Sequence, residues 1–232
     1  MNVALLTAAG RSQRMQLDTP KQFIFVKEKP VIVHTMMAFE RHPEIDAIIV
    51  VTLEKWKKTI SAYAEEFGIR KLKWFAEGGE TNQESIRNGL IELKKHCDGS
   101  DIVVVHDGNR PMVSQEIITD SLATCREYGG AVAAIPCIEA IFRSTDGICS
   151  TENIPREELF RTQTPHTYPL GKLLEAHKKA EEVCLTNTTA TCMLMSELGE
   201  KVYFSKGSDK NLKITVQDDL DIFNALLKVK QG

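Results

Sequence analysis

A cluster of small residues followed by cations, close to the N-terminus, could bind phosphate. The chain reads Thr7-Ala8-Ala9-Gly10 directly after an apolar run at residues 3–6, and Arg11, Arg14 and Lys21 follow. Small residues let backbone N–H groups approach anionic oxygens, and the cations neutralise charge that the amides alone cannot. A tight turn with solvated charges is the alternative interpretation. The three cations favour the first interpretation, which predicts a ligand that carries phosphate.

This loop is not one of the common nucleotide motifs. The sequence lacks the Gly-x4-Gly-Lys-Ser/Thr spacing of a Walker loop and the Gly-x-Gly-x-x-Gly fingerprint of dinucleotide-binding folds. It also shows no Ser–His–Asp arrangement and no isolated nucleophilic cysteine, so no residue is an obvious nucleophile for covalent catalysis. Nucleotidyl transfer needs alignment and charge neutralisation more than covalent help, and Arg14, Lys21 and a metal could supply both.

Two further polar motifs follow apolar runs. Gly78-Gly79-Glu80 comes after residues 71–75, and His106-Asp107-Gly108-Asn109-Arg110-Pro111 comes at the end of residues 101–106. A carboxylate at the mouth of a buried strand can hold a divalent cation or a substrate hydroxyl, so Asp107 is a candidate for either role. A capping or turn aspartate is the alternative. We expect His106 to be packed in the core and leave it out of the catalytic set.

These motifs need a sheet whose strand ends meet at one edge. Apolar runs alternate with segments of 3.6-residue periodicity, which predicts an α/β fold with a doubly wound, mostly parallel, Rossmann-like sheet. Ligands of such a sheet bind outside the carboxyl ends of the strands, where all three motifs would converge. The predicted strands span residues 2–7, 46–52, 71–75, 101–106 and 131–136, and the predicted helices span residues 31–41, 54–67, 82–96, 115–128 and 170–182. A helix at 188–198, strands at 201–205 and 211–215, and a helix from 216 follow.

Length and composition bound the organisation of the chain. At 232 residues it fits one domain, residues 1–232. Residues 137–164 carry only short apolar runs, and a long segment without its own core is typical of a binding arm or lid, so we interpret this segment as a protruding arm. The pair Thr81 and Glu84 predicts a capping box at the start of a helix that carries Ser85.

Charge and cysteine usage argue against several classes of protein. A net charge of −3 gives no electrostatic reason to expect a nucleic-acid partner or an anionic membrane. We see neither a charged leader followed by an apolar core nor an apolar stretch of about 18 residues, so we expect a cytoplasmic protein. Six cysteines without a Cys-x-x-Cys pair suggest neither a zinc site nor a disulfide framework.

In order and spacing, five motifs resemble the cytidylyltransferases that act on polyol phosphates. That family includes the methylerythritol-phosphate enzyme of isoprenoid synthesis and the ribitol-5-phosphate enzyme of wall and capsule polymers. The motifs, which span nearly the whole chain, are Ala8-Ala-Gly-x3-Arg14-Met15-x4-Pro20-Lys21-Gln22, Gly78-Gly79, His106-Asp107-x2-Arg110-Pro111, Gln163-Thr164-Pro165 and Asn211-Leu-Lys213-Ile-Thr215.

The resemblance implies CTP and a small polyol phosphate as substrates, with Mg²⁺ as cofactor. A phosphate oxygen of the acceptor would attack the α-phosphorus of CTP in line, and pyrophosphate would leave. The resemblance places Arg14, Lys21, Arg156 and Lys213 in catalysis, Asp107, Arg156 and Lys213 at the acceptor, and Asp107 beside the metal. It places Ala8, Ala9, Gly10, Gly79, Glu80, Ser85 and Arg110 around the nucleotide. Arg156 resembles an arginine that reaches into the neighbouring subunit's site, so the arm implies a homodimer.

Several positions depart from the family pattern, mostly on the acceptor side. Glu139-Ala140 stands where the family usually has Asp-Thr, Asn187 stands in place of an aspartate, and Gly108-Asn109 replaces two small apolar residues. In the phosphate loop, Ser12 replaces a glycine. These departures leave the acceptor open between the two named polyol phosphates. The alternatives are a sugar-1-phosphate nucleotidyltransferase and a dimer that binds CTP without turnover.

Overall fold

The architecture is a seven-stranded sheet, and the computed structural model describes residues 1–10 and 20–229 of the chain. The strand order is β11-β7-β10-β6-β1-β4-β5, and only β10 among these strands runs antiparallel to its neighbours. The strands are β1 (Asn2–Thr7), β4 (Ala47–Thr52), β5 (Leu72–Glu77), β6 (Ile102–Asp107), β7 (Ala131–Pro136), β10 (Phe160–Pro169) and β11 (Phe204–Lys206). The mostly parallel sheet is therefore confirmed.

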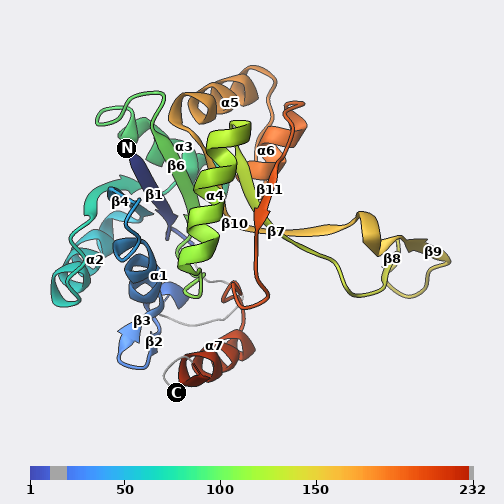
Figure 1. The fold of residues 1–232 in the computed structure, drawn as a ribbon, viewed down its shortest axis with the longest axis horizontal. Helices are drawn as coiled ribbons and strands as arrows, with labels where there is room; N and C mark the ends of the chain where they lie inside the picture. Colours follow the sequence, from blue (N-terminus) through green and yellow to red (C-terminus); the bar gives the residue numbers. More distant parts are fainter. Residues whose placement is uncertain (11–19, 230–232) are drawn as a thin grey trace.

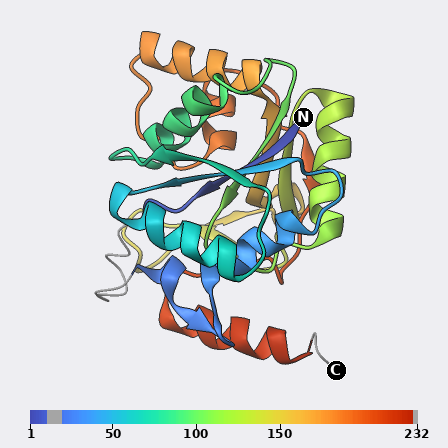
Figure 2. The ribbon, with the colours of Figure 1, turned by 90° about the vertical axis from the view of Figure 1, so that its left-hand side faces the viewer.

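Helices cover both faces of this sheet (Figures 1 and 2). The helices are α1 (Val31–Glu40), α2 (Glu54–Glu66), α3 (Asn82–Leu93), α4 (Gln115–Tyr128), α5 (Leu170–Glu182), α6 (Thr191–Glu197) and α7 (Gln217–Val229). Because successive side chains of a strand point to opposite faces, Val3 and Leu5 pack with α3, α5 and α6, whereas Ala4 and Leu6 pack with α1, α2 and α4. This arrangement is the predicted doubly wound one.

A third, smaller cluster lies below the sheet, where α7 packs against the hairpin of β2 (Phe25–Val26) and β3 (Lys29–Pro30) (Figure 1). Its buried members are Val26, Val31, Ile214, Leu220 and Phe223. The hairpin follows the short 3₁₀ helix η2 (Lys21–Phe23), and Ile214 follows Lys213. The cluster therefore holds the chain segments that carry both of these lysines.

The predicted arm is present, but its C-terminal boundary was wrong. Residues beyond β7 leave the sheet, form a hairpin of β8 (Ile141–Arg143) and β9 (Glu152–Ile154) and the 3₁₀ helix η3 (Arg156–Glu158), and extend away from the body (Figure 1). Residues 160–164 belong instead to β10, where Phe160 pairs with Pro136 and Thr162 pairs with Ala134. The backbone ladder to β7 keeps this polar stretch in the sheet.

Other differences concern element ends near the C-terminus. Residues 212–215, which lie within the described part of the chain, form no strand, and β11 spans 204–206 rather than 201–205. Helix α3 ends at Leu93, three residues earlier than expected, and α6 is limited to 191–197. Within residues 1–10 and 20–229, no helix is long and apolar enough to cross a membrane.

Candidate active site

A cleft of about 660 Å³ opens at the carboxyl ends of β1 and β6. It brings together the predicted residues Ala8, Ala9, Gly10, Lys21, Gly79, Glu80, Ser85, Asp107 and Lys213. They come from segments far apart in the sequence, and the parallel strands deliver them to one edge, as the topology of an open sheet requires. The remaining lining residues are Thr7, Gln22, Thr81, Asn82, Asn109, Thr189 and Thr215.

The first wall of the cleft is the small-residue loop after β1. The amide of Ala8 donates to the carbonyl of Val51 at 2.7 Å, which continues the sheet into the loop. Buried Gln22 donates its side-chain Nε2 to the carbonyl of Ala8 at 2.8 Å and, more weakly, to that of Gly10 at 3.4 Å. Gln22 thus joins the loop to η2, the turn that places Lys21 on the cleft. The motif contained Gln22, but no role for this residue was predicted from the sequence.

The second wall is the N-terminus of α3. Thr81 and Glu84 form the predicted capping box, with the Glu84 amide donating to Thr81 Oγ1 at 3.1 Å. The amide of Gly79 donates to Ser85 Oγ at 3.0 Å, and the amide of Glu80 donates to the Glu84 carboxylate at 2.8 Å. A Cβ on Gly78 would collide with that of Ala9, so this glycine lets the two walls meet.

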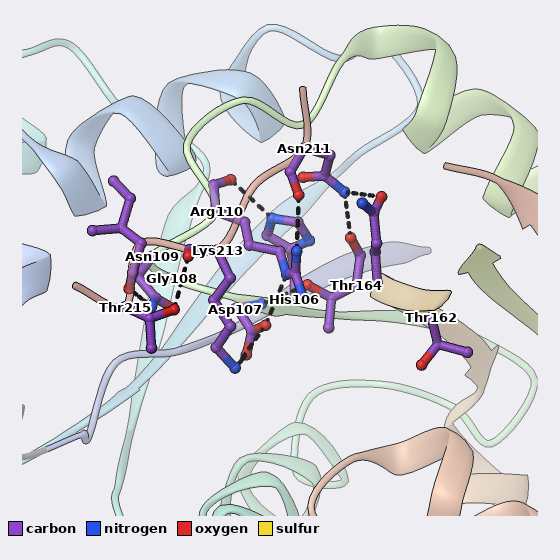
Figure 3. Close-up of polar contacts among 12 residues, drawn as sticks. His106, Asp107, Gly108, Asn109, Arg110, Thr162, Thr164, Asn211, Lys213 and Thr215 are labelled. Carbon is purple, nitrogen blue, oxygen red and sulfur yellow. Dashed lines mark hydrogen bonds and ion pairs between the residues drawn. The ribbon is translucent and has the colours of Figure 1, made fainter. Parts of the chain in front are cut away.

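Asp107, at the end of β6, lies between two cations (Figure 3). Arg110 Nε donates to Asp107 Oδ2 at 3.0 Å, and the Lys213 ammonium lies 3.1 Å from both carboxylate oxygens. Burial by itself would raise the pKa of Asp107, but the opposing charges of Lys213 and Arg110 outweigh it and hold the pKa well below its ordinary range. Asp107 is therefore an anion that organises two cations.

His106 is a core residue, as expected. It is fully buried, its ring contacts the edge of Phe39 with centroids 5.2 Å apart, and its Nε2 bonds the carbonyl of Arg110 at 3.2 Å. Burial lowers its pKa to about 3, so the imidazole is neutral near pH 7. A neutral ring that bonds a carbonyl through Nε2 carries its proton on that nitrogen. His106 therefore supports the loop that presents Asp107 and Arg110.

A smaller cavity of about 80 Å³ adjoins the cleft. The two share Thr7, Asn82, Asp107, Thr189 and Lys213. The other residues around the smaller cavity are Ile86, Val105, His106, Arg110, Thr162, Gln163, Thr164, His166, Ala190 and Thr191. Asn82 and Thr189 were missed in the sequence, although Gln163 and Thr164 belong to a motif that was noted. The shared residues form the boundary between a large and a small binding space.

The loop before α6 supplies Thr189 and is tied to α3. Gln83 Nε2 donates to the carbonyl of Leu185 at 2.9 Å, and Gln83 Oε1 accepts from the amide and the hydroxyl of Thr188 at 2.8 and 2.9 Å. Asn187 has a φ of +62°, a left-handed conformation that Asn tolerates well, and it lines neither of these cavities. The backbone at this position therefore suits Asn, and nothing in the structure explains its departure from the aspartate of the family pattern.

Two predicted cations, Arg110 and Arg156, do not line the large cleft. Arg110 lines the smaller cavity and not the large cleft. Arg156 is exposed on the arm, where its guanidinium donates to the carbonyl of Ile138 at 2.8 Å, and it lines neither cavity of its own chain. Arg14 lies outside the described residues. The structure therefore brings Lys21 and Lys213 into one cleft but keeps Arg156 away from it.

The donors around the cleft fit a cation that arrives with a phosphate ligand. No group of three or more His, Cys, Asp or Glu side chains in the described ranges could hold a metal ion by itself. Mg²⁺ commonly binds through one or two carboxylates, waters and substrate phosphates. A carboxylate has about four lone-pair sites, so Asp107 could accept such an ion beside its two cationic partners.

Comparisons with known proteins show the family of the chain. The family described as "IspD: 2-C-methyl-D-erythritol 4-phosphate cytidylyltransferase" matches residues 2–229. A ribitol-5-phosphate cytidylyltransferase of Lacticaseibacillus paracasei is 40% identical over the full length of both chains. A 2-C-methyl-D-erythritol 4-phosphate cytidylyltransferase of Clostridium acetobutylicum is 37% identical, with 98% of each chain covered.

Solved structures show the same fold. The 4-diphosphocytidyl-2C-methyl-D-erythritol synthase of Anaerococcus prevotii superposes with a TM-score of 0.82 at 25% identity, covering 98% of this chain and 96% of that one. The resemblance drawn from the five motifs is thereby confirmed, and so is the assignment as a nucleotidyltransferase enzyme. The chain belongs to the 2-C-methyl-D-erythritol 4-phosphate cytidylyltransferase (IspD) family.

Proposed function

We propose that this protein transfers CMP from CTP to D-ribitol 5-phosphate in the cytoplasm, releasing pyrophosphate and CDP-ribitol. The observation that carries the proposal is the shared boundary of the two cavities, where Asp107 and Lys213 line both the large cleft, which we assign to the nucleotide, and the smaller cavity, which we assign to the acceptor. The name of the relative from Lacticaseibacillus paracasei, and that of a relative from Vibrio parahaemolyticus that is 36% identical, support ribitol 5-phosphate as the acceptor.

The side chains around the smaller cavity also favour this acceptor. Thr162, Thr164, Thr189 and Asn82 give it a polar wall beside the apolar residues Ile86, Val105 and Ala190. Ribitol 5-phosphate carries a free hydroxyl on every carbon except the phosphorylated one, whereas methylerythritol 4-phosphate carries a methyl branch. Buried hydrogen-bonding groups discriminate strongly against a ligand that leaves them unpaired, so the polar wall suits the unbranched polyol better.

In the proposed reaction, the triphosphate lies against the Ala8–Gly10 loop and Lys21. A phosphate oxygen of the acceptor forms a bond to the α-phosphorus of CTP while the bond from that phosphorus to the β-phosphate oxygen breaks, and the electron pair leaves with pyrophosphate. Asp107 orients the polyol, and Lys213 holds the acceptor phosphate. Because two anions must meet, Lys21, Lys213 and Arg14 act mainly by neutralising charge in the transition state.

We assign Mg²⁺ to the side of the triphosphate that faces Asp107. When bound, it would neutralise phosphate charge and favour departure of pyrophosphate. The expected result is loss of turnover with excess chelator and recovery with added Mg²⁺. Turnover that persists in chelator would show the assignment to be wrong.

We also propose that the arm forms a homodimer in which Arg156 serves the partner's acceptor space. Large exposed apolar side chains on the arm, Ile138, Phe142 and Ile148, support a protein partner there. Arg156→Ala and Lys21→Ala subunits can be unfolded and refolded together to test this. If Arg156 acts across the dimer, a 1:1 mixture regains about a quarter of wild-type activity, since half the dimers are mixed and each has one intact site. An arginine acting within its own chain would give no recovery.

The acceptor is tested by measuring pyrophosphate release with CTP and Mg²⁺ against ribitol 5-phosphate, methylerythritol 4-phosphate and glycerol 3-phosphate. We expect ribitol 5-phosphate to be fastest and UTP or GTP to replace CTP poorly. A faster rate with methylerythritol 4-phosphate would overturn the acceptor while keeping the reaction. Tight CTP binding without release from any acceptor would favour a nucleotide-binding sensor instead.

A further inference from the structure

We infer that Asn109 is a positioning residue: its side-chain amide fixes the backbone at Ile214 and thereby sets the ammonium of Lys213 between the two cavities. The inference rests on the proposed function, because it assigns Lys213 to the acceptor phosphate. Asn109 belongs to the Gly108-Asn109 pair, which departs from the small apolar residues that the family resemblance leads us to expect.

Asn109 and Ile214 are joined at two points. Asn109 Nδ2 donates to the carbonyl of Ile214 at 2.5 Å, and the amide of Ile214 donates to the carbonyl of Asn109 at 2.9 Å. Both residues are buried. The side chain of Asn109 thus supplies the donor that a neighbouring strand would otherwise provide, which explains why residues 212–215 are ordered without being a strand.

The segment that carries Lys213 is held on both sides of this lysine. Before it, fully buried Asn211 donates Nδ2 to the carbonyl of Thr164 at 2.8 Å, and Arg110 Nη1 donates to the carbonyl of Asn211 at 2.8 Å. After it, the Ile214 side chain is buried against α7 while its backbone is held by Asn109. A lysine stem has four rotatable bonds, so its ammonium can reach any point within a limited distance of the backbone. The two anchors fix the backbone and thereby set the region that the ammonium can reach.

Gly108 holds the backbone directly before Asn109 in place. Its amide donates to the carbonyl of Thr7 at 2.9 Å, and its carbonyl accepts from Thr35 Oγ1 at 2.9 Å. A Cβ at this position would lie 2.8 Å from Ile32 Cδ1 and 2.9 Å from the carbonyl oxygen of Thr7. Glycine therefore lets the turn pack tightly on β1 and α1, and Asn109 reaches Ile214 from that position. The two departures from the family pattern act together.

The first test does not depend on any substrate. In Asn109→Ala, we expect the backbone amides of residues 211–215 to exchange with deuterium at least about tenfold faster than in the wild type, because the buried carbonyl of Ile214 loses its donor. Asn2→Ala is the matched control: Asn2 Nδ2 also donates to a backbone carbonyl, that of Glu44, at 2.6 Å, but at the opposite end of β1. Unchanged exchange at 211–215 in Asn109→Ala overturns the inference, whichever acceptor the enzyme uses.

The second test separates positioning from simple destabilisation. Asn109→Ala is expected to raise KM for the acceptor roughly tenfold while KM for CTP stays within about twofold. In a Lys213→Ala background, the same substitution should add almost nothing, because residues that act through one another are not additive. Equal effects on both substrates, or full additivity with Lys213→Ala, overturn the inference. If the wild type prefers another acceptor, only the proposed ribitol activity is refuted. The deuterium-exchange test needs no acceptor, and the KM values of the single and double variants are then measured with the preferred one.

Discussion

The ammonium of Lys213 lies 3.1 Å from both carboxylate oxygens of Asp107, although the two residues are 106 positions apart in the sequence. Arg110 reaches the same carboxylate from the other side at 3.0 Å. One buried anion therefore balances two cations at the boundary between the large cleft and the smaller cavity. Removing the anion should affect both the order of the site and its chemistry.

Asp107→Asn is expected to lower kcat/KM by about 10²-fold or more, because both cations lose the anion that orients them. It should also lower the free energy of unfolding by about 3 kcal/mol, since the guanidinium of Arg110, whose side chain is only 12% exposed, loses its charged partner. Asp209→Asn is a matched control, because Asp209 pairs with Arg161 at 2.8 Å on the surface. Such exposed pairs contribute at most about 1 kcal/mol, so this variant should resemble the wild type. Equal losses in the two variants would contradict the special role of Asp107.

Lys21→Ala is expected to lower kcat about 10²–10³-fold with little change in Tm, because Lys21 faces the cleft and acts on charge that develops in the transition state. Lys57→Ala removes a lysine whose ammonium pairs with Glu54 and Glu77, away from the cleft, and should leave kcat within about twofold. Pyrophosphate release measures both rates. A Lys21→Ala enzyme that keeps wild-type kcat would remove this residue from the catalytic set.

The sequence predicted the parallel core of the sheet because its strands are continuous apolar runs. It missed β10 because that strand alternates buried polar residues with few apolar ones: Gln163, Thr164, His166 and Thr167 are all buried. These side chains are polar because several of them line the smaller cavity or hold the segment around Asn211. The polar side chains therefore interrupt the hydrophobic pattern on which strand prediction depends.

The sequence likewise predicts only part of the candidate site. Ala8, Gly79 and Asp107 could be found because each lies at or within two residues of the end of a strand, and the topology of the sheet then brings them together. Asn82 and Thr189 meet through a hydrogen bond of 3.2 Å between residues 107 positions apart, and no local pattern announces such a contact. For the same reason, the hydrogen bonds from the side chains of Gln22 and Asn109 to distant backbone carbonyls could not be predicted from residue periodicity.

Phe223→Ala should test whether α7 supports the site. Phe223 is fully buried in the cluster that contains Val26 and Ile214, so its truncation should cost about 3–5 kcal/mol and lower Tm by roughly 6–20 °C. Because the cluster holds the segments next to both cleft lysines, kcat/KM should fall even at temperatures where the protein stays folded. Ile222→Ala, on the exposed side of the same helix, should change neither quantity appreciably. Wild-type kcat/KM in folded Phe223→Ala would separate α7 from the site.

His177, on α5, should make the protein sensitive to acid. It is buried, and neither ring nitrogen has a hydrogen-bond partner in the described ranges. Burial, assisted by the charge of Arg87, lowers its pKa to about 4. The imidazole of His177 has a pKa of about 6.5 in the unfolded chain, so below that pH the unfolded state binds a proton that the folded state does not bind. Stability is therefore fully present above pH 6.5 and declines as the pH falls towards 4.

His177→Leu should flatten part of this decline. Each pH unit contributes about 1.4 kcal/mol, so the penalty that the substitution removes approaches about 3 kcal/mol near pH 4. Burial also lowers the pKa values of His106 and His166, so these two residues keep the remaining loss of stability in acid. Leucine also removes two buried polar atoms without partners, so a smaller gain should remain at pH 8, where the imidazole is neutral in both states. Denaturant unfolding of both proteins at pH 5 and pH 8 measures the difference. An equal gain at the two pH values would mean that packing, not protonation of His177, limits stability in acid.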